Sequence, residues 1–101
     1  MSEVQVVYSQ AAVKDLETIW NYSRSQWSAD QADRYYLELT EQITLLSSNP
    51  HLGKTADSVR PGFRVLAVQA HHVYYRAEPN AQVEVVRILH QQMSLTRWFG
   101  I

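Results

Sequence analysis

NPHLGKTADSVRPGFRVLAVQAHHVYYRAEPNAQVEVVRILHQQM, residues 49–93, is the stretch that predicts most of the fold. It begins with a loop at 51–62, which is punctuated by proline and glycine. Three segments rich in β-branched and aromatic residues follow, and their short connections imply antiparallel neighbours. We expect strands at residues 63–69, 71–77 and 82–89, with a tight turn at 78–81.

The residues before this stretch predict one strand and a pair of helices. Alternation at Val4, Val6 and Tyr8 indicates a short first strand. Ser9 is a suitable N-cap for a first helix, which we expect to run to about Gln26.

A second helix is predicted after Ser28, which forms a capping-box pattern with Gln31 three residues later. It should end at Asn49, because the residue before a proline avoids the α region. Its apolar stripe consists of Ala32, Tyr36, Leu39, Ile43 and Leu46. The short link between the helices implies an antiparallel hairpin, and the sheet is the available cover for its apolar stripes.

The expected order is therefore β-α-α-β-β-β in a single domain spanning residues 1–101. This is an α+β fold, in which the helical hairpin packs on one face of a three- to four-stranded antiparallel sheet. Residues 91–99 would form a short C-terminal helix or an arm. No signal peptide and no membrane-spanning segment is apparent, so we expect a cytoplasmic protein that does not enter a membrane.

The composition argues against several kinds of site. The chain has no cysteine, which excludes disulfides, thiolate catalysis and cysteine-based zinc sites. Its three glycines form no phosphate-binding loop, and no GxSxG motif is present. His71 and His72 are adjacent on an expected strand, so they point to opposite faces and cannot easily share an ion. We therefore expect no metal and no cofactor.

The net charge of -1 conceals an asymmetry between the halves of the chain. Residues 1–52 carry three cations and seven carboxylates, a net charge of -4, whereas residues 53–101 carry six cations and three carboxylates, a net charge of +3. Most cations of the second half are arginines, which suit bidentate recognition of carboxylate or phosphate. A pI near 6.4 argues against direct binding of nucleic acid.

Each of the three expected strands after the loop holds one arginine: Arg64, Arg76 or Arg87. If Arg64 and Arg76 converged on one sheet face, they and His90 would supply the groups that RNA cleavage needs. The alternative, which we favour, is that the arginines pair with carboxylates of a partner or with local acids such as Glu84. The face that Arg87 occupies depends on strand register, which sequence does not reveal.

The C-terminal residues offer a second candidate surface. Large apolar side chains occur there at near-helical spacing, at Met93, Leu95, Trp98 and Phe99. They form either a terminal helix that folds back on the sheet or an exposed protein–protein contact of a composition common in binding hot spots.

Several segments resemble the ParE branch of the ParE/RelE toxin superfamily, from bacterial type II toxin–antitoxin systems. In chain order these are AVKDLETIWNY at 12–22, NPHLG at 49–53, VRPGFR at 59–64, HVYYR at 72–76 and VRILH at 86–90. Their order and spacing cover almost the whole chain.

The resemblance implies a small toxin that a ParD-like antitoxin neutralises by wrapping its C-terminal segment over it. ParE members act on DNA gyrase by stabilising its cleaved complex with DNA, and their systems contribute to plasmid stabilization. RelE relatives instead cleave messenger RNA on the ribosome, with a cluster of Lys and Arg and a Tyr or His near the C-terminus. Gln91, Gln92 and Met93 stand where that basic and aromatic end is expected, which favours a gyrase inhibitor over an enzyme. A ribosome-dependent endoribonuclease and a non-toxic binding module are the alternatives.

This hypothesis assigns no catalytic residues. It expects carboxylates of the antitoxin to bind Arg64, Arg76, Arg87 and His90. It expects the target to contact Met93, Trp98 and Phe99.

Overall fold

The computed structural model describes residues 4–77 and 82–93. Its elements follow the expected order, with one additional short strand and a short 3-10 helix. They are β1 (Gln5–Tyr8), α1 (Gln10–Gln26), α2 (Ala29–Thr44), η1 (Leu45–Ser47), β2 (Lys54–Thr55), β3 (Phe63–Val68), β4 (His71–Ala77) and β5 (Gln82–His90). Most of the expected C-terminal helix or arm lies outside the described residues.

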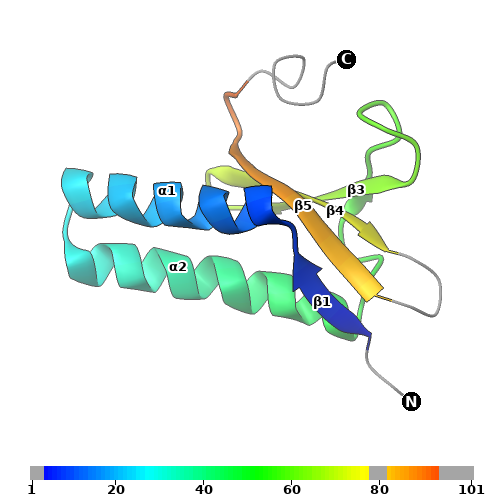
Figure 1. Cartoon of the computed structure of the whole chain (residues 1–101), viewed down its shortest axis with the longest axis horizontal. Coiled ribbons are helices and arrows are strands. Elements are labelled where there is room, and N and C mark those ends of the chain that lie inside the picture. The colour runs from blue at the N-terminus through cyan, green and yellow to red at the C-terminus, as the bar shows by residue number, and fades with distance from the viewer. Residues whose placement is uncertain (1–3, 78–81, 94–101) are drawn as a thin grey trace.

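The strands form a mixed sheet in the order β1-β5-β4-β3-β2, and the helical hairpin covers one of its faces (Figure 1). Strand β1 pairs with β5 in parallel, and the remaining pairs are antiparallel. The α+β class is confirmed, but the sheet has five strands and one parallel pair instead of three or four antiparallel strands. A parallel pair requires a long crossover, and the whole chain between β1 and β5 supplies it.

Strand β2 lies inside the stretch that was expected to be loop throughout. Its two residues, Lys54 and Thr55, pair with Val65 and Arg64 of β3. Such a short segment shows no periodicity that sequence reasoning could detect, so its pairing reflects the position of the loop beside β3.

Both helices begin at the expected caps. The Ser9 hydroxyl accepts the N–H of Ala12 at 3.0 Å, and the Ser28 hydroxyl accepts the N–H of Gln31 at 3.1 Å. These bonds satisfy N–H groups that a helix start leaves without intrahelical partners. Helix α2 ends at Thr44, and η1 continues the helical path as a 3-10 turn before the chain reaches Pro50.

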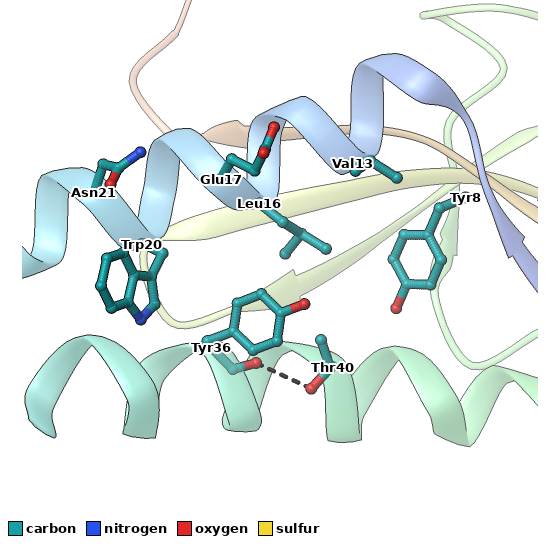
Figure 2. A pocket seen from close by; sticks show the side chains of 8 residues that line it. All are labelled: Tyr8, Val13, Leu16, Glu17, Trp20, Asn21, Tyr36 and Thr40. Carbon is teal, nitrogen blue, oxygen red and sulfur yellow. Dashed lines mark hydrogen bonds between the residues drawn. The ribbon is translucent and has the colours of Figure 1, made fainter. Parts of the chain in front are cut away.

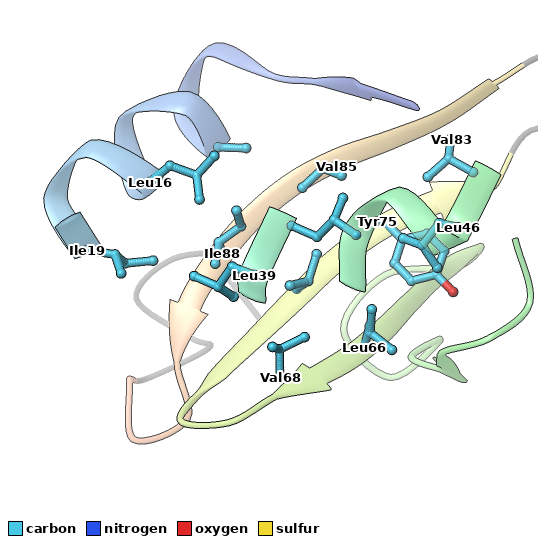
Figure 3. Close-up of a cluster of buried hydrophobic side chains, with 13 residues drawn as sticks. Leu16, Ile19, Leu39, Leu46, Leu66, Val68, Tyr75, Val83, Val85 and Ile88 are labelled. Atoms are coloured by element: carbon cyan, nitrogen blue, oxygen red, sulfur yellow. The ribbon is translucent and has the colours of Figure 1, made fainter. Parts of the chain in front are cut away.

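The main core lies between the hairpin and the sheet (Figure 3). The helices and η1 contribute Leu16, Ile19, Leu39, Ile43 and Leu46, and the strands contribute Leu66, Val68, Val73, Tyr75, Val83, Val85 and Ile88. The prediction that Tyr36 belongs to the buried apolar stripe of the second helix was wrong, because Tyr36 is 39% exposed. Its neighbour Tyr35 packs against the core instead.

A second, smaller cluster covers the opposite face of the sheet. The loop between β2 and β3 places Ala56 and Val59 against Phe63, Tyr74 and Leu89. The sheet is therefore buried on both faces, by helices on one and by a loop on the other. Among the described residues, no helix has the length and apolar character needed to cross a lipid bilayer.

Candidate functional site

Arg64 holds the loop that leads into β2. Its guanidinium donates to the Gly53 carbonyl at 2.9 and 3.2 Å and to the His51 carbonyl at 3.3 Å. The Tyr75 hydroxyl supports the same loop, since it accepts the Gly53 N–H at 2.9 Å and donates to the Pro50 carbonyl at 2.8 Å. Gly53 is required at this place, because a Cβ there would lie 2.6 Å from the Val65 carbonyl oxygen.

Arg76 pairs with Glu84, its cross-strand neighbour on β5. Its Nε lies 3.2 Å from Oε1 of Glu84, and its Nη2 also donates to that oxygen. The expectation that local acids such as Glu84 can engage these arginines is confirmed for this pair. The Arg76 side chain is 47% exposed, so the pair lies at the surface.

Arg87 forms a bidentate pair with Asp15 of α1. Its Nε and Nη2 donate to the two carboxylate oxygens at 2.8 Å each, and one of these oxygens also accepts the Ile88 N–H at 2.9 Å. The side chains of Arg87 and Asp15 are only 17% and 13% exposed. Hydrogen bonding to Asp15 raises the pKa of Arg87, so the guanidinium stays charged.

Asp15 lies beside β5 just beyond the point where the parallel pairing of β1 with β5 ends. Strand β1 pairs with β5 only as far as Val85, and α1 then leads the chain over the remaining edge of β5. Asp15 accepts a backbone N–H at that edge and a guanidinium beside it. Arg87 is therefore part of the joint between α1 and the sheet.

The arginines do not form one patch. Arg64 pairs in register with Tyr75 and Arg76 pairs with Phe63, so the two arginines lie on opposite faces of the sheet. The convergence of Arg64 and Arg76 that RNA cleavage would require is therefore absent. Arg87 is opposite Tyr74 and thus shares the face of Arg76.

His90 belongs to an aromatic cluster at the end of the sheet. Its ring meets that of His71 edge to face with 5.4 Å between centroids, and the Tyr35 hydroxyl lies 2.6 Å from Nδ1 of His71. Burial lowers the pKa of His71 to about 4, and the neighbouring His90 adds to the effect. At neutral pH the His71 ring is therefore uncharged. It packs between Tyr35 of α2 and His90 of β5.

The groups considered for RNA cleavage do not assemble. Arg64 pairs with Tyr75 of β4, whereas His90 pairs with His71 of the same strand. Arg64 and His90 are therefore separated by four residues along β4, a distance of about 13 Å. Arg76 lies on the other face. The described ranges also contain no cluster of three or more potential metal ligands.

A groove of about 930 Å³, here called the sheet-end groove, opens between the far half of the hairpin and the end of the sheet. Its walls include Tyr22 and Trp27 of the hairpin, with His71, His90 and Met93. Sequence reasoning identified His90 and Met93 but missed Tyr22 and Trp27. Both are large aromatics off the buried stripe, which is a signal that could have identified them. Trp98 and Phe99 lie outside the described residues.

A second hollow of about 490 Å³, here called the hairpin cleft, lies between α1 and α2. Figure 2 shows Trp20, Tyr36 and Tyr8 following one another along it, with Leu16 pointing into it from α1. Sequence reasoning did not identify this cleft, because it depends on which sides of the two helices face each other.

Comparison with known proteins gives consistent similarities. Residues 6–95 match the family model described as ParE toxin of type II toxin-antitoxin system, parDE. Toxin ParE1 of Mycobacterium tuberculosis is 39% identical over 88% of this chain and 91% of its own length.

Two solved structures share the fold. The chromosomal ParDE toxin–antitoxin system of P. aeruginosa superposes with a TM-score of 0.77 at 19% identity, over 87% of this chain and 96% of that one. The RelBE2 toxin–antitoxin complex of Mycobacterium tuberculosis gives a TM-score of 0.69 at 19% identity, over 92% and 97%.

Proposed function

The chain belongs to the ParE toxin family of type II toxin–antitoxin systems, and from this membership we propose that it poisons DNA gyrase until a ParD-like antitoxin neutralises it. The observation that carries the proposal is the match to the ParE family model across residues 6–95. The separation of Arg64, Arg76 and His90 supports inhibition over ribonuclease chemistry, since general acid–base catalysis needs its groups within reach of one substrate.

The sheet-end groove is the surface that we assign to the target. It combines exposed aromatic rings with Met93, and aromatic and methionine side chains are enriched in protein interfaces. The chain continues from Met93 with Trp98 and Phe99, which we assign to the same contact.

The antitoxin is proposed to approach the arginines with its carboxylates. Arg76 is the best placed of them, because nearly half of its side chain is exposed. Arg87 is less accessible than Arg76, because its guanidinium is held by Asp15 and its side chain is 17% exposed. Calorimetry with the antitoxin encoded beside this gene should show weaker binding for Arg76→Ala, and unchanged affinity would remove Arg76 from the interface.

The proposed activity is tested with purified protein, gyrase, ATP and a supercoiled plasmid. After treatment with detergent and protease, accumulated linear DNA is the expected result. Unaltered plasmid at an excess of folded protein would contradict gyrase poisoning. Messenger RNA cut in a translating extract would then identify the ribosome-dependent alternative, and no effect in either assay would indicate a binding module.

Truncation after Met93 tests the assignment of the C-terminal residues. We expect the truncated chain to keep its circular dichroism spectrum and thermal transition, because it retains every residue of the two apolar clusters that the structure describes. It should no longer produce linear DNA. Retained poisoning would remove residues 94–101 from the mechanism.

A further inference from the structure

The hairpin cleft gathers aromatic rings from three elements. Tyr8 ends β1, Trp20 lies on α1 and Tyr36 lies on α2, and all three line one hollow of about 490 Å³ (Figure 2). Tyr36 is substantially exposed although it was expected in the core. The rings therefore line a hollow that solvent can reach, where their faces are available to a ligand.

The Trp20 ring is held in a defined orientation. Its indole N–H donates to Oδ1 of Asp33 on α2 at 2.9 Å, which ties the ring to both helices. The guanidinium of Arg24 already lies 5.9 Å from the ring centroid, within the range of a cation–π interaction. The Trp20 ring is thus accessible to a guanidinium, here that of Arg24 of the same chain.

The polar groups of the cleft include one carboxylate and several oxygens that can accept a hydrogen bond. Glu17 is the sole charged side chain among the eight described residues that line it. Within residues 4–77 and 82–93, no side-chain hydrogen bond engages Glu17, Asn21 or the hydroxyl groups of Tyr8 and Tyr36. Burial and the nearby Tyr36 raise the pKa of Tyr8, so its hydroxyl stays protonated at neutral pH.

We propose that the hairpin cleft receives an arginine side chain of the antitoxin. A planar guanidinium stacks on aromatic rings and carries five N–H donors, which matches aromatic walls edged by several oxygen acceptors. Lysine matches less well, because its compact ammonium neither stacks nor spans several acceptors. The net charge of -4 on residues 1–52 adds attraction for a cation. The identification of the antitoxin as the protein that supplies this arginine rests on the proposed function. The preference for a guanidinium rests on the aromatic walls and oxygen acceptors of the cleft.

The first experiment uses the protein without its antitoxin. Nα-acetyl-arginine methylamide is titrated while the NMR signal of the Trp20 indole N–H is followed, with that signal assigned from a Trp20→Phe variant. The citrulline analogue has nearly the same shape and no charge, and is the control. We expect the arginine probe to shift the signal saturably and to bind at least about fivefold more tightly than citrulline. No saturable shift, or equal binding of the two probes, would overturn the preference for guanidinium.

The second experiment measures antitoxin affinity by calorimetry for Glu17→Gln and for Glu41→Gln. Both residues are exposed and both substitutions remove one carboxylate, but Glu41 does not line the cleft. Loss of a charged acceptor should weaken binding about tenfold for Glu17→Gln and leave Glu41→Gln close to wild type. Equal effects of the two variants would overturn the proposal while the toxin–antitoxin pairing stands. If the wild-type chain did not bind the antitoxin, the proposed toxin–antitoxin pairing would be contradicted. The probe titration would still decide whether the cleft prefers a guanidinium.

Discussion

Asp15 shows how one side chain can join distant parts of this small chain. Its two oxygens accept three N–H groups, two from the Arg87 guanidinium and one from the Ile88 backbone. A carboxylate that is mostly withdrawn from water needs such partners, because a buried charge without them is costly. Arg87, expected as an antitoxin contact, is therefore first of all a structural residue.

Arg87→Ala should destabilise the fold by about 1–3 kcal/mol, because among the described residues it leaves the Ile88 N–H as the one remaining partner of a partly buried Asp15. Arg76→Ala is the matched control, since it removes an exposed ion pair worth at most about 1 kcal/mol. Urea unfolding of the two variants measures the difference. Similar losses would show that the Asp15 joint contributes no more than a surface pair.

His71 should make stability depend on pH. The unfolded chain protonates this histidine at its ordinary pKa of 6.5, whereas the folded chain does so at about 4. Between these values the unfolded state binds more protons, so the free energy of unfolding falls as the pH is lowered from 6.5 towards 4 and is fully restored above 6.5.

Urea midpoints at about pH 5 and about pH 7 should therefore differ more for the wild type than for His71→Gln, which cannot take up this proton. The comparison between the two proteins cancels the contribution of carboxylates that titrate in the same range. Identical pH dependence would show that burial of His71 does not control its protonation.

At the scale of elements, the connection between β1 and α1 fixes the first helix to the sheet. Ser9 caps the helix through the Ala12 N–H, and its hydroxyl also donates to the Val86 carbonyl at 2.7 Å. Its backbone N–H donates to the Val85 carbonyl at 2.9 Å. The start of α1 is thus attached to β5 at the point where parallel pairing ends.

Ser9→Ala should cost about 1–2 kcal/mol, because it removes both the cap and the bond to β5. Ser28→Ala is the control, since Ser28 caps α2 at an exposed position. It should cost less, about 0.5–1 kcal/mol. Thermal or urea unfolding measures the order of the two losses, and a larger effect at Ser28 would contradict the dual role of Ser9.

At the scale of the whole molecule, the sheet separates two apolar clusters of unequal size. The larger one holds the hairpin against the sheet, and the smaller one holds the loop that joins β2 to β3. Because hydrophobic burial is the dominant favourable term in folding, the larger cluster should control global stability.

Leu39→Ala should lower the free energy of unfolding by about 2–5 kcal/mol, since Leu39 is fully buried between hairpin and sheet. Leu37→Ala changes the same side chain on the same helix at a position 56% exposed, and should alter stability by no more than about 0.5 kcal/mol. Chemical denaturation compares them. Equal effects would contradict the assignment of the core face of α2.

Much of the architecture was predictable because its signals are local. Caps at Ser9 and Ser28 depend on groups three residues away, and strand β4 was recognisable from its own composition. The exposed position of Tyr36 was not predictable, because Tyr35 and Tyr36 are equally apolar neighbours and the hairpin geometry selects between them.

The candidate site was predictable in its residue types but not in its arrangement. Arg64, Arg76 and Arg87 were identified correctly as strand arginines. Their faces depend on register, and the register of β4 against β5 shifts between Tyr74 and Tyr75. A shift of one residue exchanges the two faces of a strand, so alternation along β5 cannot place Arg87.

Local sequence thus specifies the order of helices and strands, their caps and the class of fold, because these depend on interactions between residues a few positions apart. Folding of the whole chain adds the parallel pairing of β1, the Asp15–Arg87 joint and the two hollows beside the hairpin. Each of these joins groups far apart in the chain, whose meeting depends on register and packing that local periodicity does not encode.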